Sequence, residues 1–354
     1  MGIAADRREE GAKRPGWLQI ILPFILAGAV LSLAFYGIDL QLLLQSMKNV
    51  PAFQCIMAMA AICVLLLLAD LGTYTLCYRW FLLPTISTWQ VLCLRANLFL
   101  VVATFAPLAP LVPIAYFYRR WKLPVVTVFG TSLVPAFLDG FTGTMVWTVT
   151  LFLRPEPSDL IWYGPLGLHW LFLFLTVRYY SSPEKAFLFG AGEKLFAAIR
   201  RSSVMHAFRQ ATIHRYGAVF TMRMALMVGH LLCIDVLLDA VGISLTLRQW
   251  GIFVPFFVGS AFMPVSAGGY GGPQGVAIYF LVMQWQVATR ETALAFSIIW
   301  STLFLLGRVL LGSLFVMAFF RQMQGPVVSS VAGPQGTPAE GDGLLRHGGP
   351  SGSL

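Results

Sequence analysis

The sequence has 354 residues, of which 58% are hydrophobic and only 11% are charged, and it carries a net charge of +9. Soluble globular proteins contain about 25% charged residues, so this composition excludes an ordinary soluble domain and predicts a polytopic, all-α integral membrane protein. The basic residues lie mainly in short connections between apolar runs, as charges that set membrane topology do. We therefore expect membrane lipids as partners and no nucleic acid.

Six apolar stretches are long enough to cross a bilayer, which takes about 20 residues. They are residues 17–37, 52–78, 124–153, 160–177, 218–247 and 292–320. Residues 1–16, with charges of both signs, should form a cytoplasmic N-terminus, and the Gly-, Pro- and Ser-rich residues 323–354 a disordered tail. An integral membrane domain is thus expected over residues 17–322, with halves at about 17–153 and 160–320.

Two further apolar stretches are interrupted by helix-breaking residues. Residues 96–118 contain Pro107, Pro110 and Pro113, and residues 249–287 contain a run rich in proline and glycine at 263–273. Proline removes a helical hydrogen-bond donor and glycine frees the backbone. We expect neither stretch to form a continuous helix.

The distribution of basic residues predicts how the chain is threaded. Residues 178–215 are strongly basic and should be cytoplasmic, whereas the net acidic turn 154–159 should be external. The basic cluster of Arg119, Arg120 and Lys122 stays cytoplasmic only if residues 96–118 enter the membrane and return on the same side. The same reasoning makes residues 249–287 re-entrant from outside. Both termini are then cytoplasmic, in a bacterial inner membrane.

This threading gives two halves of opposite orientation, each with two spans, a broken re-entrant segment and a third span. The sequences Phe105-Ala-Pro-Leu-Ala109 and Phe262-Met-Pro-Val-Ser266 share a short pattern at the matching place in each half. Interrupted segments at matching positions indicate the binding site of a transporter. Chance similarity of two short segments is the alternative.

The glycine-rich run in the second broken segment is the most informative motif. Backbone amides freed by such a run can bind an anionic headgroup, as clustered N–H groups bind phosphate. The candidate lipid-binding residues here are Pro264, Ser266, Gly268, Gly269, Gly271, Gly272 and Gln274, with Pro107, Pro110, Arg119 and Arg120 in the first segment. The alternative is a glycine-rich turn that serves only close packing.

Charged residues inside predicted spans are costly in hydrocarbon and usually face a partner or a cavity. Asp139 and Arg308 lie in the middle of the third span of each half, where inverted symmetry would bring both toward the centre. They are candidate lipid-binding residues, or alternatively a structural pair. No nucleophile motif or metal-ligand spacing is present, so we expect no catalytic site, metal or cofactor.

The run Met263-Pro-Val-Ser-Ala-Gly-Gly-Tyr-Gly-Gly-Pro-Gln-Gly275 resembles the Pro-x-Ser-Pro-Gly-Gly-Leu-Gly-Val-Arg-Glu-Gly element of the lysylphosphatidylglycerol synthase transmembrane, or flippase-like, family. The resemblance covers roughly residues 15–322. It implies a stand-alone lipid-handling domain, without the aminoacyl-transfer domain of the name-giving members, related to hopanoid or glycolipid metabolism. The Arg-Glu pair of the family falls on Pro273 and Gln274, which puts in doubt any ion pairing there.

The resulting hypothesis is a protein that binds membrane lipids, with an anionic headgroup, and translocates them. Two alternatives remain: an accessory subunit or enzyme of lipid biosynthesis that uses Asp139, His230 or Asp235, and a passive assembly partner of such enzymes that docks through its basic loop.

Overall fold

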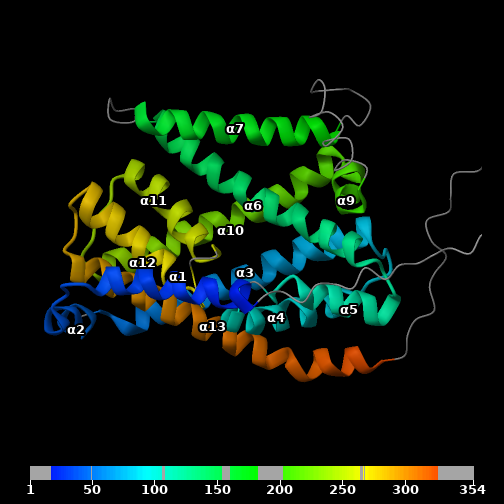
Figure 1. Ribbon diagram of the computed structural model, residues 1–354, viewed down its shortest axis with the longest axis horizontal. Coiled ribbons are helices and arrows are strands. Elements are labelled where there is room, and N and C mark those ends of the chain that lie inside the picture. The colour runs from blue at the N-terminus through cyan, green and yellow to red at the C-terminus, as the bar shows by residue number, and fades with distance from the viewer. Residues whose placement is uncertain are drawn as a thin grey trace, which may run out of the picture.

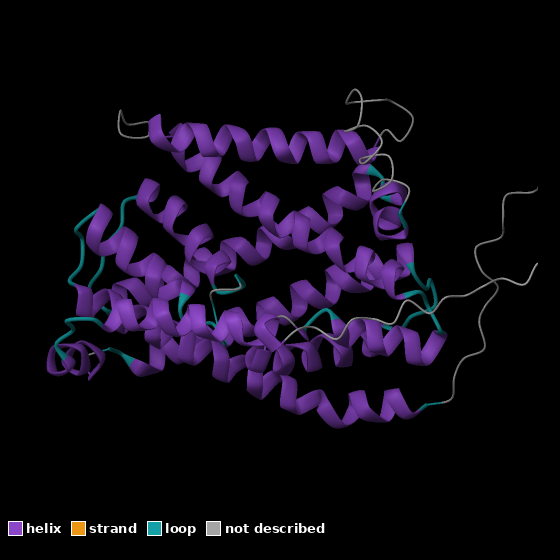
Figure 2. Cartoon of the chain, viewed as in Figure 1, coloured by secondary structure: helices purple, strands orange, loops and turns teal. Residues whose placement is uncertain are grey.

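The computed structural model describes residues 17–48, 50–105, 108–153, 160–181, 202–263, 266 and 268–325. Within these residues the protein is all helical and contains no strand, as the sequence predicts (Figure 2). The elements in chain order are α1 (Trp17–Phe35), α2 (Leu40–Lys48), α3 (Ala52–Phe81), α4 (Thr88–Phe105), α5 (Leu111–Trp121), α6 (Val125–Leu153), α7 (Leu160–Ser181), the 3₁₀ helix η3 (Ser203–Met205), α9 (His206–Gln210), α10 (Ile213–Ala240), α11 (Leu247–Ser260), α12 (Gly272–Ala277), the π-helix η4 (Ile278–Gln284) and α13 (Arg290–Gln324).

Four helices are long and apolar enough to span a bilayer: α3, α6, α10 and α13. The shortest has 28 residues, and at 1.5 Å per residue about 20 residues already match the hydrocarbon thickness. All four overlap predicted spans. Helix α13 continues to Gln324, so residues 323 and 324 of the predicted tail are helical. Residues 1–16 and 326–354 lie outside the described residues.

The two remaining predicted spans are also helical, and the first is sharply bent. In the first, Ile25–Phe35 of α1 and Leu40–Lys48 of α2 meet at a bend of 93°. Gly37 takes a φ of +71°, and the Asp39 carboxylate accepts a hydrogen bond from Gln41 N at 2.8 Å, which ends one helix and caps the next. Helix α7, with 22 residues, covers the second, residues 160–177.

Both predicted interruptions are present. Helix α4 ends at Phe105 and α5 begins at Leu111, directly after Pro110. Pro113 lies in the first turn of α5, where a missing N–H costs nothing. Helix α11 ends at Ser260 and α12 begins only at Gly272.

The helices of the two halves pack closely against each other (Figure 1), with α7 along one edge, the C-terminal part of α13 along the opposite edge and α6 and α10 between them. Helix α4 lies along α13, where a Cβ on Gly312 would come 2.9 Å from Ala96 O. Helix α11 lies along α6, where a Cβ on Gly251 would overlap Thr150. Small residues at these crossings let the backbones approach.

Candidate functional site

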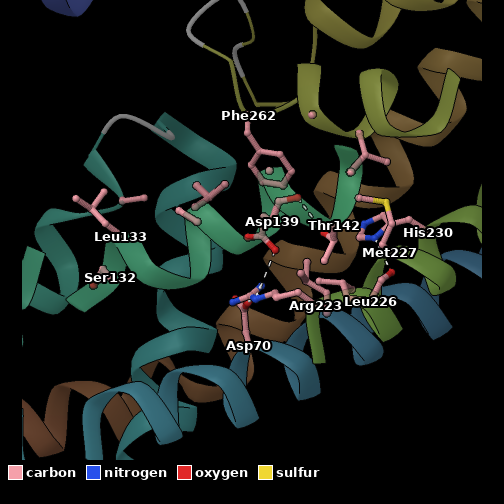
Figure 3. A pocket seen from close by; sticks show the side chains of 18 of the residues that line it. Asp70, Ser132, Leu133, Asp139, Thr142, Arg223, Leu226, Met227, His230 and Phe262 are labelled. Atoms are coloured by element: carbon pink, nitrogen blue, oxygen red, sulfur yellow. Dashed lines mark hydrogen bonds and ion pairs between the residues drawn. The ribbon is translucent and has the colours of Figure 1, made fainter. Parts of the chain in front are cut away.

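A cavity of about 720 Å³ lies where the two interrupted segments meet (Figure 3). It is lined from both halves of the chain and its walls are mainly apolar. The ends of α4 and α5 contribute Val102 and Pro110, and the end of α11 contributes Gly259 and Phe262. Its charged lining residues are Asp70, Arg95, Asp139, Arg223 and Arg308. A large apolar space with a few buried charges is suited to an amphipathic ligand.

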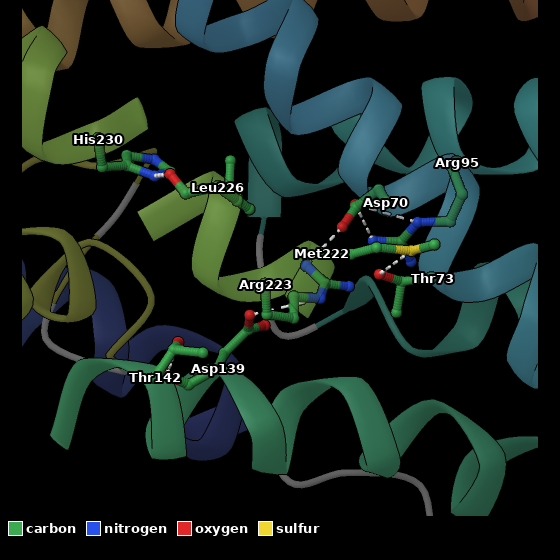
Figure 4. Close-up of polar contacts among 9 residues, drawn as sticks. All are labelled: Asp70, Thr73, Arg95, Asp139, Thr142, Met222, Arg223, Leu226 and His230. Atoms are coloured by element: carbon green, nitrogen blue, oxygen red, sulfur yellow. Dashed lines mark hydrogen bonds and ion pairs between the residues drawn. The ribbon is translucent and has the colours of Figure 1, made fainter. Parts of the chain in front are cut away.

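Asp70 on α3 organises the charged wall (Figure 4). Its carboxylate accepts hydrogen bonds from Arg95 on α4, with Nε at 3.2 Å, and from Nη1 of Arg223 on α10 at 2.8 Å. All three side chains are buried. One carboxylate therefore joins three helices and holds two guanidinium groups that would otherwise be costly to bury.

Asp139 on α6 adds the second carboxylate. Its Oδ1 lies 3.5 Å from Arg223 Nε. The Asp139 side chain is 50% exposed and faces the cavity (Figure 3). The Tyr74 ring lies 3.6 Å from the Arg95 guanidinium and 5.5 Å from that of Arg223, measured to the ring centroid. Two aspartates thus balance two arginines, and Asp139 is much more exposed to the lumen than the buried Asp70.

Arg308 on α13 lies apart from this cluster although it lines the same cavity. It is buried, and its guanidinium lies 3.9 Å from the Phe304 ring centroid and 5.1 Å from that of Phe262. Among the described residues it makes no hydrogen bond or ion pair, and its Nε has no partner. The alternative prediction of an Asp139–Arg308 pair is therefore wrong within this part of the chain, because Asp139 faces Arg223 instead.

The glycine-rich loop is held in place mainly by hydrogen bonds within the loop and to α13. Ser266 Oγ donates to Ser260 O at 2.7 Å and accepts from Gly272 N at 3.0 Å. Gln274 Oε1 accepts from Gly271 N at 2.7 Å, and its Nε2 donates to Ser301 Oγ at 3.1 Å. The amides of Gly271 and Gly272, which the sequence suggested for ligand binding, are thus already used inside the protein.

The glycines themselves are required by backbone geometry. Gly268, Gly269 and Gly271 have φ values of +61°, +90° and +103°, a region that other residues rarely adopt. A Cβ on Gly268 would come 3.2 Å from Ala103 O, which places this loop against the end of α4. The loop therefore lies against the first interruption, although its described glycines are not among the residues that line the cavity.

The remaining predicted site residues differ in their position relative to the cavity. Pro110 lines the cavity. Arg119 and Arg120 do not line it; they lie at the end of α5, where Arg120 Nη1 donates to Gln322 O at 2.6 Å. Pro107 and Pro264 lie outside the described residues.

Sequence reasoning missed the cluster of Asp70, Arg95 and Arg223. Asp70 and Arg95 each stand alone in their own stretch of sequence, so nothing local connects them. The available signal was Arg223, a basic residue inside the predicted span 218–247. His230, on the same helix, lines the cavity, whereas Asp235 is exposed on another face.

Comparison of the chain with models of protein families and with curated proteins finds no match.

Proposed function

We propose that this protein binds membrane lipids and moves them across the bacterial inner membrane. The observation that carries the proposal is the cavity between the two halves, with apolar walls and buried charged side chains. A lipid has the same division, because its chains need an apolar surface and its headgroup needs charged or hydrogen-bonding partners. The resemblance of residues 263–275 to the flippase-like family supports the same function, including a lipid related to hopanoids or glycolipids.

We further propose that α4 and α5 form one re-entrant segment. Trp89 at the start of α4 packs on Phe315 of α13, with ring centroids 5.8 Å apart. At the end of α5, Arg120 Nη1 donates to Gln322 O of α13 at 2.6 Å. Contact of both ends of the segment with the C-terminal part of α13 supports a return of the chain to the side from which it entered.

The second interrupted segment supports an inverted repeat of six spans and two re-entrant segments. Phe253 in the middle of α11 lies 6.5 Å from Trp285 after η4, measured between ring centroids, so the chain after η4 folds back alongside α11. Helix α4 of the first half packs on α13 of the second, and α11 of the second packs on α6 of the first. The reciprocal packing is the arrangement that an inverted repeat produces.

The topology is testable by cysteine labelling, because the five native cysteines are buried. An impermeant maleimide added to intact spheroplasts should label Leu247→Cys, which lies at the exposed start of α11, and should label Arg119→Cys only after permeabilisation. Arg215→Cys provides the cytoplasmic reference. Labelling of Arg119→Cys from outside would contradict the re-entrant segment and the proposed cytoplasmic basic clusters.

The function is testable in proteoliposomes. We expect purified protein to speed the transbilayer movement of fluorescent phospholipids, measured by quenching of the outer leaflet, relative to protein-free vesicles. The same vesicles should retain a soluble dye, which separates lipid movement from leakage. Folded protein that retains bound lipid but produces no movement would exclude translocation and favour an accessory role in lipid biosynthesis.

A further inference from the structure

The charges of the cavity do not balance. Three arginines and two aspartates line it. Asp70 pairs with Arg95 and Arg223, and Asp139 pairs with Arg223. Arg308 is left as the cation without a carboxylate in the described part of the chain. A buried guanidinium retains its charge, so this position favours a ligand that brings one negative charge.

Next to this cation the cavity presents an acceptor. His230 is buried, and its Nδ1 lies 3.0 Å from Leu226 O (Figure 4). A carbonyl oxygen can only accept, so Nδ1 carries the proton and Nε2 of the neutral ring has a free lone pair. Across the described residues, Nε2 has no hydrogen-bond partner.

One aromatic ring connects these two groups. Phe304 lies beneath the Arg308 guanidinium at 3.9 Å, and its centroid is 6.2 Å from that of the His230 ring, at an edge-on angle of 79°. Arg308 and His230 therefore flank one ring and both line the cavity. A donor cation and a neutral acceptor thus lie beside the same ring at the cavity.

We infer that Arg308 and His230 form the headgroup subsite, and that it selects a lipid with one oxyanion and a nearby hydroxyl. The guanidinium donates to the oxyanion, while Nε2 of His230 accepts from the hydroxyl. Arg95 and Arg223 take no part, because Asp70 and Asp139 already neutralise them. This inference rests on the proposed lipid-binding function and defines the class of lipid.

Two lipids of equal charge test it. Phosphatidylglycerol has an anionic phosphodiester and free hydroxyls, whereas phosphatidylpropanol has the phosphodiester alone. In equilibrium binding to the purified full chain, phosphatidylglycerol should bind about tenfold tighter, as expected for one additional hydrogen bond. His230→Phe should remove that preference by weakening only phosphatidylglycerol. Arg308→Gln should weaken both lipids by about tenfold or more.

The matched control is Arg321→Gln, which removes an exposed arginine in the last turn of α13, outside the cavity, and should leave both affinities unchanged. Thermal melting in detergent establishes that each variant is folded. Equal binding of the two lipids by the unaltered chain, or unchanged binding by folded Arg308→Gln, overturns the subsite while leaving lipid binding intact. Inorganic phosphate that binds as tightly as phosphatidylglycerol would assign Arg308 to a soluble anion instead. Absence of binding by every lipid overturns the proposed function as well.

Discussion

Replacement of Asp70 by alanine should severely destabilise the protein. The change leaves the guanidinium groups of Arg95 and Arg223 buried without the carboxylate that both contact. Removing one member of a buried ion pair costs about 3 to 5 kcal/mol, a large part of a typical unfolding free energy of about 5 to 15 kcal/mol. We expect a strongly lowered melting midpoint or loss of monodisperse protein in detergent, measured by fluorescence-detected size-exclusion chromatography after heating.

Asp139→Ala is the matched control for this prediction. Its carboxylate lies 3.5 Å from Arg223 and is 50% exposed to the cavity, so its removal leaves Arg223 still bound to Asp70. The melting midpoint should fall much less than in Asp70→Ala. Equal midpoints for the two variants would show that Asp70 does not hold the three helices together.

The elements that sequence predicts well are those fixed by local chemistry. Long apolar runs predict α3, α6, α10 and α13, because a helix in hydrocarbon must satisfy its own backbone. Pro110 and the glycine-rich run predict the two interruptions for the same local reason. The sharp turn between α1 and α2 is also local, but its signal is only Gly37 followed by Asp39, and a stretch judged by hydropathy alone does not reveal it.

The candidate site is less predictable because its groups are far apart in the chain. Asp70 pairs with Arg95 and with Arg223, which lies 153 positions further on. Asp70 and Arg95 alone resemble a span end and a topology charge, Arg223 is identifiable as a charge inside a span, and only packing of α3, α4 and α10 brings the three together. Asp139 and Arg308 could be identified singly as buried charges, but the partner of Asp139 depends on the same packing.

The glycine-rich loop illustrates a different limit. Its composition correctly indicates unusual backbone, since Gly269 and Gly271 have positive φ. Composition does not indicate which amides are free, and here Gln274 and Ser266 occupy those of Gly271 and Gly272. The direct contribution of this loop to headgroup binding stays a prediction.

The most direct test of lipid passage through the cavity is a substitution that fills it. Gly140 lines the cavity on α6, and a Cβ added there would meet no atom within 4 Å, so the side chain of Gly140→Phe should project into the lumen without disturbing the packing. Gly217→Phe is the matched control, since Gly217 on α10 is equally open and is not among the residues that line the cavity.

Transbilayer movement of fluorescent phosphatidylglycerol should be measured in proteoliposomes with equal amounts of the unaltered protein and each folded variant. Gly140→Phe should fall to the rate of protein-free vesicles, while Gly217→Phe should retain the rate of the unaltered protein. Undiminished movement by folded Gly140→Phe would contradict the cavity as the route of the lipid.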